Sequence, residues 1–424
     1  MRNAIVRYVA VFVLAVCLAM GLLLLAACVP QNPVDSHVKV SAEIMVQDGL
    51  YPTVFDKADT SRLDTWTDAI ILAQCKAMSI TDWETVLTNP MYETAIQNPV
   101  ESLYDYVQAE NPQPTSFYAR YWMGFRAVYR VLLSFLNYYQ ILRYQAVLVL
   151  VLWMAAVCSV ARHTDSRKAF LFAVSIILVR PQIVVMSIQY CCCFVIAFCA
   201  ILAVPWIVRH RQYQGLFFFL IGMATMYFDF YTTPALTFGL PMVYLYLLQE
   251  NRIDLKQMVK WIAIWALGYL GMWFAKMLLT TLLTDVNGLA NGLQSMMARL
   301  GVRKTGGQEQ TYRLVEAVRA VWYALYSDNV GKVLLLLCGA CGFAAFLAAV
   351  FCKKVPVSII WKQRPLLFLS AVPIVWMLAA PHVTYIHYWF QYRSIALSFW
   401  SAGSYCLLLF EKDHSWMKKR NCTP

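Results

Sequence analysis

The sequence is poor in charged residues: only 14% of its 424 residues are Asp, Glu, Lys or Arg, whereas 60% are hydrophobic. The mean hydropathy is +0.55. A soluble globule of this length would not have enough polar residues to cover its surface. The composition therefore excludes an ordinary soluble fold and predicts a protein embedded in a lipid bilayer.

Motifs for nucleotide binding and hydrolysis are also missing. The chain has no Walker loop, no dinucleotide-binding glycine fingerprint, no HExxH zinc motif and no nucleophile elbow. No sequence motif therefore supports ATP-driven transport or protease activity. No metal site is predicted, and the sequence leaves the need for a cofactor open.

The regular alternation of apolar and polar residues that marks membrane barrel strands does not recur. Apolar residues occur instead in runs of about 18 to 25, the length that crosses the bilayer as a helix. We therefore predict an all-α, polytopic transmembrane bundle of about ten spans. The expected spans are 6–28, 143–161, 169–180, 183–208, 215–230, 232–248, 259–283, 331–352, 365–380 and 394–411.

The net charge of +12 is unevenly distributed along the chain. Residues 29–120 contain eight Asp and five Glu against three Lys and two Arg, a net charge of −8, so the rest carries +20. Much of this excess lies in short breaks between apolar runs, as the positive-inside rule describes, and no nucleic acid partner is expected. The pattern predicts a multi-pass protein of the cell membrane with both termini in the cytoplasm and the acidic segment outside.

The amino terminus allows a second interpretation. Leu25 to Cys28 resembles a lipoprotein cleavage site after a charged start and an apolar core. Cleavage would leave Cys28 as a lipid-anchored residue, whereas the apolar run of about 23 residues is longer than a usual signal core. We expect the first span to be retained.

The acidic segment is too long and polar for a simple connection and is expected to fold outside the membrane. Helices are predicted from Asp64 to Cys75 and after a capping box of Thr81 and Glu84. The spacing also predicts amphipathic helices lying on the membrane at Tyr118–Tyr139 and Thr311–Ser327. We expect five regions. They are a first span (1–28), an outer domain (29–142), a transmembrane bundle (143–283), an outer loop (284–330), and the last spans with a cytoplasmic tail (331–424).

Two acids of the outer domain are candidates for chemistry. Asp64 and Asp68 are four residues apart and share one face of the predicted helix. Their mutual repulsion is tolerable where a proton or a cation lies between them. The alternative is a pair of solvated acids at the start of a helix.

Charged residues at the membrane are the second set of candidates. Asp229 and Lys276 lie within apolar runs, where an ionised side chain is costly and needs a role or a route to the interface. Arg126 and Arg130 lie on the predicted interfacial helix. The last outer loop contributes Arg393, which suits an anion at the membrane surface, beside aromatic anchors.

A histidine of the same loop, His387, is a further candidate for substrate binding. It lies five residues after His382, which is a poor spacing for two metal ligands on one helix. Interfacial anchoring by the neighbouring aromatic residues accounts for most of this loop.

Fragments spread along the chain resemble the GT-C superfamily of multi-pass membrane glycosyltransferases, and more closely bacterial polytopic membrane proteins of that plan. The fragments are SAEIMVQDGLYPTVFD, RLDTWTDAIIL, YARYWMGFRAVYR, MYFDFYTTP, MWFAK and HYWFQYR. The resemblance implies a first span leading into a large outer loop with interfacial helices, and a sugar donor carried on a polyprenyl phosphate.

The resemblance also implies roles for residues. Asp64 or Asp68 would be the catalytic base that deprotonates an acceptor hydroxyl. Lys276, Arg126 or Arg393 would neutralise the departing lipid phosphate. Two other functions stay open: a transporter or flippase of lipid-linked sugars that uses Asp229 and Lys276, and a membrane scaffold without chemistry. The oligomeric state is not predicted.

Overall fold

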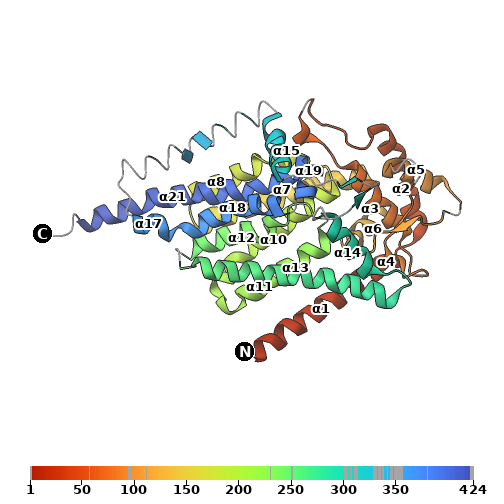
Figure 1. Ribbon diagram of the computed structural model, residues 1–424, viewed down its shortest axis with the longest axis horizontal. Helices are drawn as coiled ribbons and strands as arrows, with labels where there is room; N and C mark the ends of the chain where they lie inside the picture. The colour runs from red at the N-terminus through yellow and green to blue at the C-terminus, as the bar shows by residue number, and fades with distance from the viewer. Residues whose placement is uncertain are drawn as a thin grey trace.

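The computed structural model describes residues 2–420, except 57, 94–97, 111, 230, 250–251, 300–303, 306–307, 310–313, 380 and most of 328–356. The described chain is almost entirely helical (Figure 1). Two short antiparallel strand pairs complete it: β1 (Pro90–Met91) with β2 (Ser116–Phe117), and β3 (Lys304–Thr305) with β4 (Gln308–Glu309). The all-α prediction is confirmed.

The helices follow one another along the whole chain. Up to residue 133 they are α1 (Arg2–Ala27), α2 (Gln31–Asp48), η1 (Asp59–Ser61), α3 (Thr65–Ala77), α4 (Thr85–Thr88), α5 (Pro99–Gln108) and α6 (Arg126–Leu133). From there to residue 283 they are α7 (Tyr138–His163), α8 (Ser166–Ile177), α9 (Pro181–Val184), α10 (Ile188–Arg209), η2 (Arg211–Tyr213), α11 (Gln214–Phe228), α12 (Ala235–Leu248) and α13 (Leu255–Leu283). The remaining ones are α14 (Gly288–Arg299), α15 (Leu314–Ser327), α17 (Val357–Lys362), α18 (Arg364–Ala379), α19 (Pro381–Ile386), α20 (Tyr388–Gln391), η4 (Tyr392–Ser394) and α21 (Ile395–Arg420).

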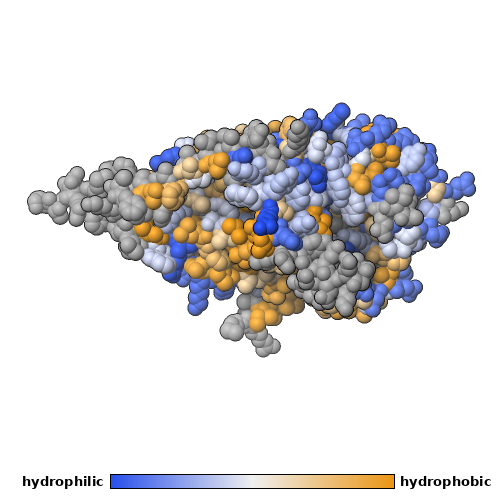
Figure 2. All heavy atoms as spheres, turned by 45° about the horizontal axis from the view of Figure 1, so that its top comes forward, coloured by the Kyte–Doolittle hydropathy of each residue, from blue (hydrophilic) through white to orange (hydrophobic). Residues whose placement is uncertain are grey.

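Four of the described helices are long and apolar enough to cross a membrane. They are Ile5–Ala27 of α1 and the whole of α7, α10 and α13. Helices α12 and α18 are apolar but shorter. On the face drawn in Figure 2, hydrophobic residues gather over the middle of the molecule. These are the features of a membrane protein, as the composition predicts.

The helix starts follow from the local sequence. Asn137 and Gln140 form a reciprocal capping box at the start of α7, and the Asp254 side chain accepts from the Gln257 backbone at the start of α13. Each cap satisfies a backbone N–H that has no partner within its helix. Both long helices therefore begin where a polar residue precedes an apolar run.

Helices α11 and α13 pack with their backbones in close contact. A side chain at Gly222 would meet the Trp265 carbonyl oxygen at 2.1 Å, and one at Gly268 would meet the Phe219 carbonyl oxygen at 2.4 Å. Small residues let two membrane helices approach closely enough to pack without a hydrophobic driving force. Two further pairs, α10 with α12 and α18 with α21, complete the body of the bundle.

Helices α2 to α6 form a separate layer at one end of the bundle, which we call the cap region (residues 31–133). It occupies the right-hand end of Figure 1, where α2, α3 and α5 pack on one another. Its core is apolar, with Val38 and Met45 of α2 beside Ile71 of α3 and Leu103 of α5 fully buried. The predicted folding of this segment is confirmed.

Every predicted span that falls on described residues coincides with a helix. The match is closest at the four long helices, and α8, α11, α12, α18 and α21 cover the remaining predicted positions. The predicted span at 331–352 lies almost wholly outside the described residues.

Predictions for the shorter elements were mixed. The helix beginning at Asp64 is confirmed as α3, and α15 confirms a helix within 311–327. The capping box at Thr81 is wrong, because α4 begins at Thr85 with no side-chain cap. Helices α2 and α5 were not predicted.

The predicted helix Tyr118–Tyr139 is broken into three parts. Residues 118–125 are not helical, and Met123 has a positive φ of 51°, which no helix accommodates. Helix α6 then covers eight residues, and α7 begins at Tyr138. The exposed side of α6 is apolar, since Val128 and Val131 lie on it while the arginines turn inward.

Candidate functional site

The cap region meets the bundle where the start of α3, the start of α10 and the α20–η4 turn converge. The Trp389 indole N–H donates to the Tyr190 hydroxyl at 3.1 Å, and that hydroxyl donates to the Arg62 carbonyl at 3.2 Å. Tyr388 donates to an Asp59 carboxylate oxygen at 2.8 Å. The last of these bonds joins residues more than 300 positions apart in the sequence, and together the three bonds tie the segment before α3 to α10 and to the α20–η4 turn.

Asp64 is a buried acid at this junction. It is the N-cap of α3, and its two carboxylate oxygens accept from the backbone N–H and the hydroxyl of Thr67, at 3.0 and 2.9 Å. An N-cap acid is a common way to begin a helix. Asp64 is 2% exposed, and among the described residues its carboxylate accepts hydrogen bonds only from Thr67.

Arg393 of η4 lies near enough to Asp64 for its positive charge to act on that carboxyl, although the two side chains form no ion pair. Its guanidinium lies 4.2 Å from the centre of the Tyr190 ring, and its Nη2 donates to the Thr60 carbonyl at 3.4 Å. Nε and Nη1 are buried and find no hydrogen-bond partner among the residues that the structure describes. We call Asp64, Arg393, Tyr190 and Thr60 the junction site.

The electrostatics of Asp64 reflect this setting. Burial raises the pKa of its carboxyl from 3.8 to about 6, against the Thr67 hydrogen bonds and the charge of Arg393, which lower it. A carboxyl with a pKa near the working pH can both accept and return a proton, which is the requirement for general acid–base chemistry.

Asp68 lies one turn further along α3 but has a different environment. Its carboxylate accepts from the Tyr138 hydroxyl, from the Ser187 hydroxyl at 3.1 Å and from the backbone N–H groups of Ile188 and Gln189 at 3.1 and 3.4 Å. Burial raises its pKa to about 7, although the donors lower it. Asp68 therefore caps α10 and ties α3 to α7 and α10.

The structure thus separates two acids that the sequence treats alike. Both are buried, so the alternative of two solvated acids at the start of a helix is wrong. Asp68 has four donors and no room for another partner, whereas Asp64 has only Thr67 and a nearby cation. The predicted pairing of the two carboxylates around a shared ion has no support in these contacts.

The two arginines of α6 bind backbone carbonyls. Arg130 donates to Ala26, Val29 and Cys75 oxygens and to the Gln31 side chain, and it is 1% exposed. Arg126 donates to the Val86 carbonyl at 2.9 Å. The predicted basic face is therefore turned into the protein, where it joins α6 to α1 and to the cap region.

Lys276 of α13 has the same kind of partner. Its ammonium donates to the Leu87 carbonyl and, at 3.0 Å, to the Thr280 hydroxyl, and the side chain is fully buried. It does not snorkel to the interface. We call Arg126, Arg130 and Lys276 the carbonyl-bound cations, because each donates to backbone carbonyls; Arg130 and Lys276 connect the cap region to α1 and α13, whereas the partners of Arg126 lie within the cap region.

The remaining predicted residues lie apart from each other. Asp229 ends α11 and accepts from the Thr232 backbone N–H and hydroxyl, the latter at 2.5 Å. His387 stacks on the Phe390 ring at 5.0 Å between centres. The side chain of His382 lies outside the described residues. Of the predicted residues, only Asp64 and Arg393 meet in the junction site.

Sequence reasoning missed Tyr190, which lies beneath Arg393 at the start of α10. It stands in the run IQYCCCF, whose composition indicates only a buried apolar helix. A tyrosine at the first turn of such a helix is a weak signal for a polar contact. Its place in the junction site depends on the packing of the α20–η4 turn, which no local pattern predicts.

An apolar groove of about 790 Å³ runs along α6, α7, α10 and α11. Its walls include Val128, Leu148 and Leu220, which are exposed on the surface of the bundle, so the groove opens where lipid would be. Cys191 and Cys192 line it on α10, directly after Tyr190. The first turn of α10 therefore serves both the groove and the junction site.

Within the described part of the chain, no three His, Cys, Asp or Glu side chains are grouped closely enough to hold a metal ion. Comparison with known proteins adds no assignment: no protein-family model, no curated protein and no solved structure matches this chain. What the site does must therefore be argued from its own chemistry.

Proposed function

We propose that the chain is a GT-C-type membrane glycosyltransferase that moves a sugar from a polyprenyl-phosphate carrier to a cell-envelope acceptor. The observation that carries the proposal is the buried pair of Asp64 and Arg393, in which the acid has a raised pKa and the guanidinium has two unused donors. A base and an anion binder in one site are what such a transfer requires.

The proposed step uses the two residues in turn. Asp64 accepts the proton of the acceptor hydroxyl while that oxygen bonds to the anomeric carbon of the sugar. The bond from the anomeric carbon to the phosphate oxygen breaks, and its electron pair leaves with the phosphate. Nε and Nη1 of Arg393 donate to the phosphate oxygens as negative charge develops there.

The apolar groove supports a lipid-linked donor. Its walls lie on α6, α7, α10 and α11, and its residues along α10 directly follow Tyr190 of the junction site. A prenyl chain in the groove would hold its phosphate near the start of α10, where Arg393 lies. Asp68 has no such role in the proposal, because its four donors occupy both carboxylate oxygens and leave no position for an acceptor hydroxyl.

The proposed topology follows from charge. About ten spans, with both termini and the basic breaks in the cytoplasm, would present the cap region and the junction site at the outer face of the cell membrane. The nine helices that coincide with predicted spans are consistent with this path. Transfer would then take place on the side where cell-envelope acceptors lie.

The test is sugar transfer in membranes that contain the Asp64→Asn variant. Asn retains the cap, because its side-chain oxygen still accepts from the Thr67 backbone, but it cannot take a proton. We expect transfer of labelled sugar from the lipid carrier to fall by about 100-fold or more. Lipid-linked glycans should accumulate in cells that carry this variant in place of the native chain.

The matched control is Asp105→Asn, an exposed acid of α5 in the same cap region. It removes the same charge and should leave transfer unchanged. Native transfer by the Asp64→Asn variant, at equal protein levels, would contradict the proposal.

A flippase of lipid-linked sugars is the second candidate, because the groove opens at the lipid-facing surface of the bundle. Purified protein in liposomes separates the two functions. A flippase moves the carrier lipid without changing its head group, whereas a transferase alters the head group. A scaffold would do neither, and would depend on residues 30–116 as a whole rather than on Asp64.

A further inference from the structure

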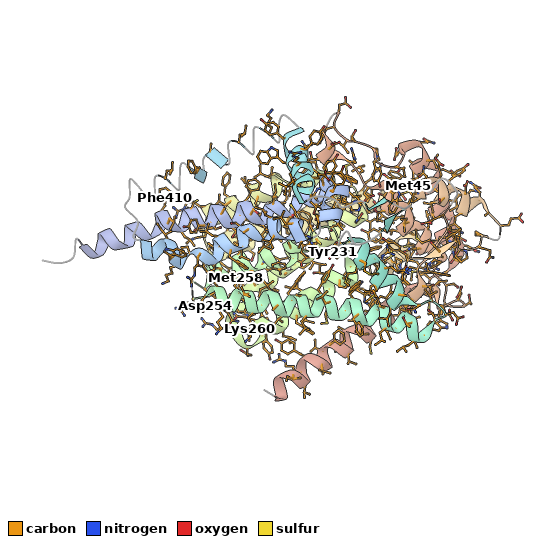
Figure 3. All side chains as sticks on the ribbon, in the orientation of Figure 1. Met45, Tyr231, Asp254, Met258, Lys260 and Phe410 are labelled. Carbon is orange, nitrogen blue, oxygen red and sulfur yellow. The ribbon has the colours of Figure 1, made fainter. Side chains whose placement is uncertain are left out.

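A second cavity lies at the end of the bundle away from the cap region. It has a volume of about 470 Å³ and lies between the start of α1, the turn η2 with the start of α11, and the first turns of α13. Figure 3 shows Lys260 of α13 at this end, with Asp254 and Met258, whereas Met45 of the cap region lies at the other. The cavity is therefore separate from the junction site.

The cavity walls carry positive charge and no acid. Arg7, Arg211 and Lys260 line it, and no Asp or Glu is among the described residues of the lining. The nearest acid along α13, Asp254, accepts from the Gln257 backbone as a helix cap. Three cations around one cavity repel each other, so an anion between them is favoured.

A buried amide lies in the same cavity. Gln214, at the start of α11, is 7% exposed, and its Nε2 has no hydrogen-bond partner among the described residues. A buried donor without an acceptor is costly and indicates a missing partner. The guanidinium of Arg7 lies 4.5 Å from the centre of the Tyr213 ring, which holds that cation at the cavity wall.

The polarity of the cavity changes along its length. On α13 the lining runs from Gln257 and Lys260 to Ile264 and Leu267, which all lie on one side of the helix. Ten residues of helix span about 15 Å, roughly the distance from a lipid head group into the acyl region. Leu267 is exposed, so the apolar part opens toward lipid.

We infer that this cavity binds the phosphodiester head group of an anionic membrane lipid, with an acyl chain along Ile264 and Leu267. Basic cavities between membrane helices on the cytoplasmic side suit such head groups. Arg7, Arg211 and Lys260 neutralise the phosphate, and Gln214 donates to one of its oxygens. The lipid then fills the wedge between α1 and the α11–α13 pair.

The experiment titrates phosphatidylglycerol into the full chain, purified and delipidated in a neutral detergent, and follows the thermal unfolding midpoint. Phosphatidylglycerol should raise the midpoint to saturation, because a ligand of the folded state stabilises it. Phosphatidylcholine and inorganic phosphate at the same concentrations should not. Phosphatidylcholine tests whether acyl chains alone stabilise the protein, and inorganic phosphate tests whether a soluble anion does. The two comparisons therefore distinguish an anionic lipid head group from both.

Two variants locate the effect. The double variant Arg7→Gln with Arg211→Gln should weaken phosphatidylglycerol binding about thirtyfold, since each cation near the surface contributes a few-fold. The matched control is Arg252→Gln with Lys256→Gln, which removes two exposed cations at the same end but outside the cavity, and it should change binding less than twofold. Gln214→Leu removes the unpartnered donor without changing charge and should weaken binding about tenfold.

Three results would overturn the inference. Equal stabilisation by phosphatidylcholine would mean that apolar filling is sufficient. Equal binding of inorganic phosphate would assign the cavity to a soluble anion. Equal weakening in the control double variant would mean that diffuse surface charge, and not this cavity, attracts the lipid.

Discussion

Arg393 of the junction site and Arg130 of the carbonyl-bound cations are buried charges at the same border, yet they use their hydrogen-bonding capacity differently. Arg130 makes four hydrogen bonds, three of them to backbone carbonyls. Arg393 makes one to a backbone carbonyl and leaves Nε and Nη1 without partners in the described chain. A buried charge whose donors are all used holds the fold together, whereas one with donors to spare can receive a ligand.

The carbonyls that Arg130 binds explain why it lies there. Ala26 and Cys75 belong to the last turns of α1 and α3, where carbonyls have no partner within their own helix and carry partial negative charge. One planar guanidinium satisfies both helix ends. The cap region is therefore anchored to the first membrane helix by a residue with no part in the proposed chemistry.

The largest expected effect is on Arg130. Arg130→Gln should destabilise the fold by roughly 5 kcal/mol, because several charge-assisted hydrogen bonds are lost and buried carbonyls stay unsatisfied. Arg393→Gln should cost less, about 2 kcal/mol, because one backbone hydrogen bond and the contact with the Tyr190 ring are lost. The measurement is the thermal unfolding midpoint in detergent, together with the amount of folded protein in membranes.

The opposite ranking would reverse the comparison. If Arg393→Gln removed the folded protein while Arg130→Gln left it intact, Arg393 would be the structural residue. Arg143→Gln, which changes an exposed cation of α7, serves as the control for the loss of one charge and should leave the midpoint unchanged.

Much of the fold could be predicted from the sequence, because membrane helices carry their signal locally. An apolar run such as 259–283 must satisfy its own backbone in lipid, and the structure has α13 there. The helix beginning at Asp64 is equally predictable, because acidic residues lie in its first turn. Helix α2 was missed because its polar sequence gives no apolar run and no cap residue, and Pro30 precedes it.

The site could be predicted only in part, since it is built from long-range contacts. Asp64 and Arg393 stood out because each is a charge at a structural boundary. Nothing local distinguishes Asp64 from Asp68, because the difference comes from Tyr138, Ser187 and the start of α10. Arg126 was predicted to face outward, since an amphipathic pattern does not reveal which face the rest of the protein covers.

The second prediction separates the two acids by stability. Asp68→Asn should destabilise the fold by about 2 kcal/mol, since the amide can accept from only some of the four donors and the others stay buried without a partner. Asp64→Asn should change stability by less than about 1 kcal/mol, because the cap hydrogen bond to Thr67 survives. Chemical or thermal unfolding of the two variants at pH 7 measures the difference.

Equal destabilisation by the two substitutions would remove the distinction between Asp68, which has four donors, and Asp64, which accepts only from Thr67. A greater loss in Asp64→Asn would assign the structural role to Asp64 instead. Transfer activity gives an independent comparison, because Asp68→Asn should retain activity in proportion to the folded protein that remains.

The smallest expected effect is the contribution of Asp64 to the pH dependence of stability. The pKa of Asp64 is raised from 3.8 to about 6 in the fold, so between these values the folded chain binds more protons than the unfolded chain. The stability from the protonated carboxyl is fully present below pH 3.8 and is lost as the pH rises through about 6. Between pH 5 and pH 7 this loss is about 1 kcal/mol for Asp64. Asp68, whose pKa is raised to about 7, also loses its contribution to stability as the pH rises, and this loss continues to higher pH than that of Asp64.

The unfolding midpoint should therefore fall from pH 5 to pH 7 in the native chain, and fall less in Asp64→Asn, which no longer titrates. The positive charge of Arg393 lowers the pKa of Asp64. In Arg393→Gln the decrease of the unfolding midpoint that comes from Asp64 should therefore occur at higher pH. The same slope in all three proteins would mean that Asp64 is exposed to water and separated from Arg393. The proposed base and its cation would then not share a site.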